Sequence, residues 1–177
     1  MSGSSIVFYF MVYALAGWGL EQLYCRFTTG AYKKDGFLRG PFKPMYGIAP
    51  LLIFWFIQPD MIWIQVAGIC ILLPTIVELV SGILLNRWFN MRYWDYSGYP
   101  FQIKGYICVR FSIYWMLLSL AVLYGVQPVL ASVYEVIAPV WLYIEPAVLL
   151  YLAADIGWTV VHKRVRKGGA APEPIQE

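Results

Sequence analysis

Long apolar stretches constrain this chain more than any other feature of its sequence. A helix needs about 20 mostly apolar residues to cross roughly 30 Å of hydrocarbon. Several stretches meet this requirement, and one is shorter. In chain order they are Ile6 to Cys25, Pro44 to Ile57, Met61 to Leu85, Tyr106 to Tyr124 and Tyr134 to Val161. We therefore expect an all-α polytopic membrane protein.

Composition supports a membrane location and argues against a soluble globular protein, a nucleic-acid-binding protein or a disordered chain. Of the 177 residues, 60% are hydrophobic and only 13% are charged, whereas soluble domains carry roughly 25% charged residues. The lipid bilayer is therefore the expected environment, and no nucleic-acid partner is expected. The cysteines lack metal-ligand spacing and there is a single histidine, so the sequence predicts neither a metal site nor a cofactor.

The placement of basic residues decides whether the short stretch, Pro44 to Ile57, crosses the membrane. As a helix it would span only about 21 Å. All 13 Lys and Arg residues lie between the first two stretches, at or between the third and fourth, or after the fifth. Basic loops stay cytoplasmic, and these three segments share a side only if the short stretch crosses. We expect five transmembrane helices, an outside N-terminus and a cytoplasmic C-terminus.

The domain organisation follows from the same pattern. Residues 1–162 are expected to form a single transmembrane helical domain. Residues 163–177 begin with basic side chains, and the part after Lys167 has the composition of a linker. We expect this tail to be cytoplasmic and, after Lys167, disordered.

Several charged side chains fall inside the predicted helices, where charge is costly and usually functional, and four of them lie at a similar depth. Glu21, Glu78 and Asp155 lie about 6, 10 and 9 Å in from the cytoplasmic ends. Arg110 lies about 6 Å past Tyr106. We predict that the four converge in one layer and bind a substrate or ion. The alternative is that Arg110 pairs with an acid as an interhelical contact, while Glu21 reaches the membrane interface.

Helical spacing gives these charges polar or small neighbours on the same face. Tyr106 and Tyr114 flank Arg110, Tyr151 and Thr159 flank Asp155, Gly17 precedes Glu21, and Gly82 follows Glu78, each at a spacing of four. This pattern favours an inward-facing site. Glu145 lies nearer the outer half of the membrane and is followed by Pro146. It is a candidate second position on a path through the membrane.

Two loops on the predicted cytoplasmic side carry further candidate residues. The first is dense in Gly and Pro between Gly36 and Gly47, which fixes turns. The second contains Trp94-Asp95-Tyr96-Ser97. The predicted gating residues are Arg39, Gly40, Pro41, Tyr46, Trp94, Asp95 and Tyr96. Asp95 either accepts hydrogen bonds from Ser97 in an Asx-turn or pairs with Arg39 or Arg92.

These motifs resemble a known family. The motifs occur in matching order over roughly Ile6 to Gln127. The first group is Gly17-Trp18, Glu21 and Tyr24-Cys25, and the second is Gly36-Phe37-Leu38, Gly40-Pro41, Pro44 and Tyr46-Gly47. These are followed by Glu78, by Trp94-Asp95-Tyr96-Ser97, and by Gly105 with Ile107-Cys108. This combination resembles the bacterial family of putative type IV ABC-transporter permeases, which implies a bacterial inner-membrane protein. The chain departs from the family at Lys34-Asp35 and at Tyr106, so no anion-binding role is expected at those positions.

The favoured interpretation is a small transport protein, a permease or channel, for a small polar or cationic solute or protons. Glu78 and Asp155 would be coupling or gating carboxylates, and Glu21 and Arg110 would form a cytoplasmic vestibule. No Gly-x-x-x-x-Gly-Lys-Ser/Thr phosphate loop is present, so an ABC-type mechanism would need a separate ATPase. A homodimer is expected, because five helices enclose only a narrow path.

Two alternatives remain. One is a membrane-embedded enzyme acting on a lipid or lipid-linked substrate, with Asp95, Glu78 or Glu21 as acid or base and Arg39 or Arg110 holding a phosphate. The sequence shows no nucleophile with an adjacent base, which disfavours this function. The other is an assembly subunit of a larger membrane complex, in which the polar residues would join helices.

Overall fold

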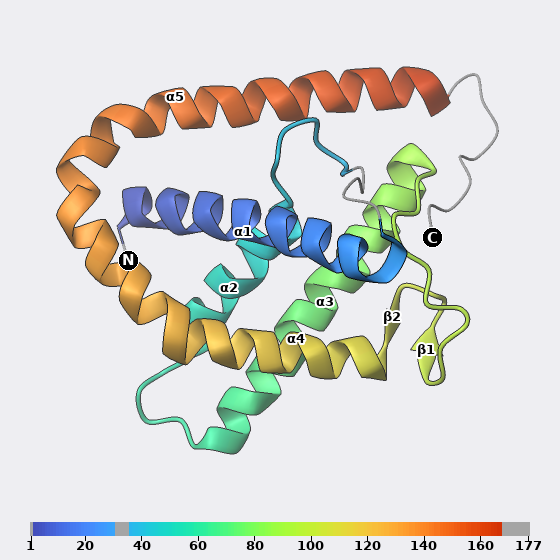
Figure 1. Ribbon diagram of the computed structural model, residues 1–177, viewed down its shortest axis with the longest axis horizontal. Coiled ribbons are helices and arrows are strands. Elements are labelled where there is room, and N and C mark those ends of the chain that lie inside the picture. Colours follow the sequence, from blue (N-terminus) through green and yellow to red (C-terminus); the bar gives the residue numbers. More distant parts are fainter. Residues whose placement is uncertain (1, 31–35, 168–177) are drawn as a thin grey trace. The chain divides into compact units, whose positions relative to one another are not determined.

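The computed structural model describes residues 2–30 and 36–167 and is predominantly helical (Figure 1). In chain order, the elements are α1 (Gly3–Thr29), α2 (Pro44–Phe56), α3 (Trp63–Phe89), β1 (Gln102–Ile103), β2 (Ile107–Cys108), α4 (Val109–Ala121), the π-helix η1 (Val122–Val126) and α5 (Gln127–Lys167). The small antiparallel pair β1–β2 is the exception to the helical structure of residues 2–30 and 36–167. The predicted tail after Lys167 lies outside the described residues.

Three helical segments of the described chain are long and apolar enough to cross a membrane. They are Gly3–Thr29, Trp63–Phe89 and Val109–Lys163. The 13-residue α2 is also apolar but would span only about 20 Å. The chain is therefore a helical membrane protein, as its composition predicts. The count of five crossings and the sidedness stay predictions.

The helical stretches were anticipated better than the connections between them. Helix α2 ends one residue before the predicted limit at Ile57. The predicted connection Gly125 to Val133 is instead helical, through η1 and the start of α5. The N–H of Gln127 reaches the carbonyl of Val122, the wider bond of a π-turn. This turn accommodates Gly125, and Pro128 falls in the first turn of α5, where proline is tolerated.

The chain forms two compact units, which are described separately. The first unit comprises the described parts of residues 1–47 together with 132–167, and the second comprises residues 48–131.

Aromatic and small residues pack α1 against the first half of α5 and the start of α2 in the first unit. The Phe8 ring lies 5.2 Å from both the Tyr134 and Trp141 rings, and the Trp141 indole donates to the Ser4 carbonyl at 3.2 Å. Further along α1, Gly17 faces the ring of Tyr46, where an added Cβ would lie 2.1 Å from Cγ. The absence of a side chain at Gly17 thus permits the start of α2 to approach α1 closely.

The core of the second unit lies among α2, α3 and α4. Ile53, Val66 and Cys70 are buried, and their partly buried neighbours include Leu120. Nearer the other end of α3, Gly82 packs against the rings of Trp94 and Tyr106, with 2.8 Å from a hypothetical Cβ to the nearer ring. The loop between α3 and α4 therefore lies directly on the face of α3 that carries Gly82.

Candidate functional site

The four predicted site residues divide between the two units. Glu21 on α1 and Asp155 on α5 belong to the first unit, whereas Glu78 on α3 and Arg110 on α4 belong to the second. Convergence of all four would span both units and stays a prediction. Within each unit, however, a buried carboxylate of a long helix contacts a predicted gating loop.

In the first unit, Asp155 binds the backbone of loop 36–43. Asp155 is 8% exposed. Oδ2 accepts a hydrogen bond from the Gly40 N–H at 2.9 Å, and Oδ1 accepts from the Arg39 N–H at 3.2 Å. Thr159, one turn along α5 as its spacing predicted, adds a weaker hydroxyl contact at 3.4 Å. We call this arrangement the Asp155 contact.

Glu21 holds the other end of the same loop. Its carboxylate forms an ion pair with Lys43, with 2.5 Å between Nζ and Oε2. Lys43 is 8% exposed, and its N–H donates to the Ala14 carbonyl of α1 at 3.0 Å. Lys43 was not among the predicted site residues. The sequence did offer one indication that Lys43 could belong to the site: it lies at the end of a Gly–Pro loop, directly before an apolar helix.

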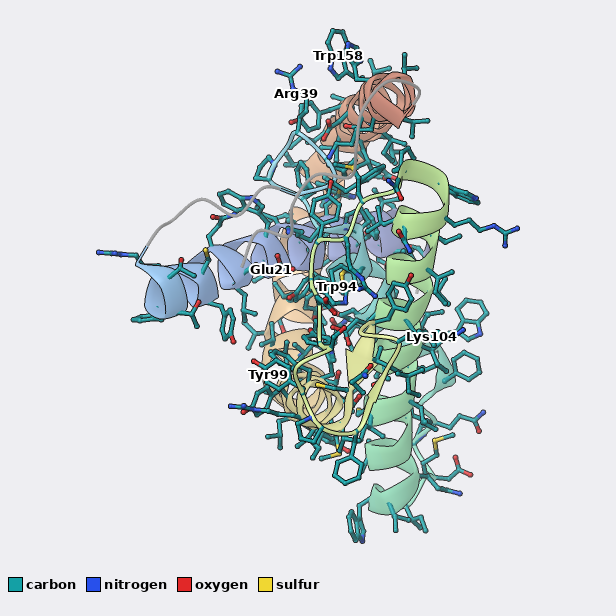
Figure 2. All side chains as sticks on the ribbon, turned by 90° about the vertical axis from the view of Figure 1, so that its right-hand side faces the viewer. Glu21, Arg39, Trp94, Tyr99, Lys104 and Trp158 are labelled. Carbon is teal, nitrogen blue, oxygen red and sulfur yellow. The ribbon has the colours of Figure 1, made fainter. Side chains whose placement is uncertain are left out.

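Aromatic and basic side chains cover the exposed side of loop 36–43. The Arg39 guanidinium lies 5.6 Å from the centre of the Trp158 ring, and Figure 2 shows these two side chains together. Trp158 in turn stacks on His162 at 4.1 Å. Lys163 donates to the Gly36 carbonyl at 3.4 Å. This group was not predicted from the sequence, although Trp158 and His162 are four residues apart on one helix face.

In the second unit, Glu78 is the most deeply buried of the predicted charges, with 2% of its surface exposed. The hydroxyl of Tyr96 donates a hydrogen bond to its Oε1 at 2.9 Å. The Tyr96 ring stacks on Phe111 of α4 at 4.6 Å. This arrangement, which we call the Glu78 contact, joins α3 to the loop between α3 and α4.

Arg110 is exposed and surrounded by tyrosines (Figure 2 labels Tyr99). Its Nε donates to the Tyr114 hydroxyl at 3.0 Å, and its guanidinium lies 5.7 Å from both the Tyr99 and Tyr114 ring centres. The predicted neighbour Tyr114 is therefore present. Tyr106 is not on the same helix, because α4 begins only at Val109; its hydroxyl instead accepts from Asn86 at 2.7 Å.

Asp95 organises the loop that contains Trp94 and Tyr96. Its Oδ1 accepts from the Ser97 N–H at 3.0 Å and from the Ser97 hydroxyl at 2.6 Å, as the Asx-turn interpretation expected. Arg92 lies 3.4 Å from Oδ2. The Ser97 hydroxyl bond, followed by the Ser97 N–H and the charge of Arg92, holds the pKa of Asp95 below its ordinary value. The Trp94 indole donates to the Tyr106 carbonyl at 2.9 Å.

Two of the predicted loop residues, Tyr46 and Gly40, have local packing roles. Tyr46 fills the space beside Gly17. A Cβ at Gly40 would lie 2.6 Å from the Tyr151 hydroxyl and 3.0 Å from Asp155 Oδ2, so only glycine fits there without movement. Within residues 2–30 and 36–167, no three His, Cys, Asp or Glu side chains are grouped so that they could hold a metal ion.

Comparison with known proteins gives a match to one family model. Neither the curated proteins nor the solved structures contain a significant match. The family described as Putative ABC-transporter type IV matches residues 8–160, which include both units and both loops. The chain therefore belongs to this transporter family.

Proposed function

We propose that this chain is a small membrane transport protein, a permease or channel, for a small polar or cationic solute or protons. One observation carries the proposal. In each unit, a carboxylate buried on a long apolar helix holds a loop through a hydrogen bond: Asp155 binds Gly40, and Glu78 binds Tyr96. A buried charge is costly in a membrane helix and is usually retained for function.

These contacts suggest how a permeant cation or proton would act. A carboxylate that accepts hydrogen bonds in its charged form loses much of their strength when it is protonated or binds a cation. Neutralising Asp155 would weaken its hold on the Arg39 and Gly40 N–H groups, and neutralising Glu78 would weaken its hold on Tyr96. Loops 36–43 and 92–106 would then be released, so these loops act as gates in the proposed mechanism.

The proposed setting is the bacterial inner membrane, with five crossings, an outside N-terminus and cytoplasmic loops. The one-sided distribution of Lys and Arg supports this orientation. The family name supports an associated ATPase, which would be a separate chain. A homodimer would enlarge the narrow path that five helices can enclose.

The test compares Glu78→Gln with the matched variant Glu135→Gln. Glu135 is an exposed glutamate on α5, so the same substitution there should leave transport intact. Purified protein in proteoliposomes is assayed for proton and monovalent-cation flux and for uptake of small polar solutes. Glutamine cannot be charged, so either a constitutive leak or a loss of cation- or proton-dependent flux in Glu78→Gln alone, with unchanged folding and reconstitution, supports the proposal. Full transport by Glu78→Gln would contradict it.

An assembly subunit of a transporter complex is the second candidate. It is favoured by the observation that Glu21, Glu78 and Asp155 all contact groups of the same chain, as residues with a purely structural role would. In that case, Glu78→Gln would lower the yield of the complex without changing transport per assembled complex. Measuring both quantities for the same variant separates the two functions.

A further inference from the structure

The hairpin between α3 and α4 is anchored to the first residue of an apolar helix. Strands β1 and β2 pair Gln102 with Cys108 and Ile103 with Ile107. Helix α4 begins immediately afterwards, and the N–H of Val109 donates to the Phe101 carbonyl at 3.3 Å. Val109 also begins a helical segment long and apolar enough to cross a membrane. Phe101 therefore lies at the level where that helix would enter the bilayer.

The hairpin exposes large apolar side chains at its end. Phe101 is 83% exposed and Ile103 is 55% exposed. Phe101 also has a φ of 53° and Lys104 a φ of 50°, a left-handed conformation that is unfavourable for bulky residues. Two hydrogen bonds support the turn: Gln102 Oε1 accepts from the Gly105 N–H, and the Lys104 carbonyl accepts from Arg92, both at 2.6 Å.

The same region carries a strong positive charge. Between residues 86 and 111 there are four cations, Arg87, Arg92, Lys104 and Arg110, and a single acid, Asp95. Asp95 is already bound by Ser97 and lies 3.4 Å from Arg92. Lys104 is exposed and forms no ion pair with any residue that the structure describes (Figure 2). An exposed apolar pair beside excess positive charge matches an anionic lipid surface.

We propose that this hairpin binds the anionic leaflet of the bilayer, with Phe101 and Ile103 at the acyl boundary and Lys104 on lipid phosphate. Unlike Trp94 and Tyr96, whose polar atoms bond within the protein, Phe101, Ile103 and Lys104 are exposed. Binding would fix the hairpin, and with it the start of α4, at the membrane surface. The inference does not depend on what the protein transports.

The experiment places the photoreactive phenylalanine analogue p-benzoylphenylalanine at position 101 of the full chain. The protein is reconstituted in vesicles of phosphatidylglycerol and phosphatidylcholine, irradiated and analysed by intact mass. Lipid adducts are expected at 101 and, in a second variant, at 103. The matched control carries the analogue at exposed Gly98, where an added Cβ meets nothing within 4 Å; it should give several-fold fewer lipid adducts.

Charge selectivity is tested in the same assay. In vesicles with equal amounts of the two lipids, Lys104→Gln should lower the ratio of phosphatidylglycerol to phosphatidylcholine adducts about fivefold, whereas Lys104→Arg should preserve it. An unchanged ratio in Lys104→Gln would overturn the phosphate contact. Cross-links from 101 to a second copy of the chain, or equal lipid labelling at 98 and 101, would overturn the membrane-binding role of the hairpin.

Discussion

Gly40 occupies a position that no larger residue can take without moving its neighbours. A Cβ there would come within 2.6 Å of the Tyr151 hydroxyl and 3.0 Å of Asp155 Oδ2. We expect Gly40→Ala to displace loop 36–43 and to lower the free energy of unfolding by about 1 to 3 kcal/mol. Equilibrium unfolding of the purified protein in detergent measures this change.

A matched control for Gly40→Ala is available on α3. A Cβ at Gly68 meets nothing within 4 Å, so Gly68→Ala should leave stability unchanged or raise it, since alanine favours helix over glycine. Combining Gly40→Ala with Tyr151→Phe removes the Tyr151 hydroxyl, the atom nearest to the added Cβ. The double variant should therefore recover part of the lost stability. Equal effects at Gly40 and Gly68 would show that close packing at Gly40 does not matter.

Asp95 provides a test by pH. Its folded pKa lies below the ordinary carboxyl value, chiefly because the Ser97 hydroxyl stabilises the charged form. The stability that the charged Asp95 carboxylate gives the folded protein is therefore fully present above the unfolded pKa of about 3.9. This stability is lost as pH falls through the lower folded pKa. Amide-exchange protection of loop 92–106, corrected for intrinsic exchange, should fall over that acidic range in the native protein. Asp95→Asn should already show the reduced protection at neutral pH and little further change.

Three predicted contacts between residues close in sequence are present: Asp95 with Ser97, Asp155 with Thr159 and Arg110 with Tyr114 follow from turn or helix spacing. A fourth local neighbour, Tyr106, lies outside α4. Lys43 with Glu21, and Asp155 with the loop backbone, join parts of the chain far apart in sequence. Spacing along one element carries no information on such pairs, because they depend on how elements pack.

At the scale of elements, α1 and the end of loop 36–43 are joined by the Glu21–Lys43 ion pair, whose side chains are 18% and 9% exposed. Removing one member of a buried pair leaves the other charge uncompensated, at a cost of roughly 3 kcal/mol. Lys43→Met and Glu21→Leu should each destabilise the protein by about this amount. The double variant should lower the free energy of unfolding by less than the sum of the two single effects.

A double-mutant cycle in detergent unfolding measures the coupling between these two residues. The control cycle pairs Glu21→Leu with Lys104→Met, a lysine of the other unit with no ion pair among the described residues. That cycle should be additive within about 0.5 kcal/mol. Additivity of the Glu21 and Lys43 variants would show that the ion pair does not stabilise the loop.

Local sequence signals predicted some element boundaries but not others. Helix α2 begins at Pro44 as predicted, because proline suits the first helical position. Gly125 and Pro128 also look like stop signals, but a π-turn incorporates the first and the opening of α5 the second. The hairpin β1–β2 was missed since its two-residue strands are too short to show periodicity.

For the whole molecule, the proposed gating requires that a loop can be released without unfolding the helices that hold it. In the first unit, this depends on whether Asp155 holds loop 36–43 through its charge. In Asp155→Asn, one side-chain oxygen is replaced by an NH₂ group, which cannot accept the second backbone N–H. The substitution should therefore weaken the loop contact while preserving side-chain size.

We expect Asp155→Asn to make proteoliposomes leaky to small ions, because the loop is released without any permeant ion. The same variant should be cleaved several-fold faster by trypsin after Arg39, which lies at the contact. Glu135→Gln, a matched amide substitution at an exposed position of α5, should change neither measurement. Faster cleavage without a leak would show that the Asp155 contact holds the loop but does not gate transport. A variant resembling the native protein in both assays would contradict the role of the Asp155 charge altogether.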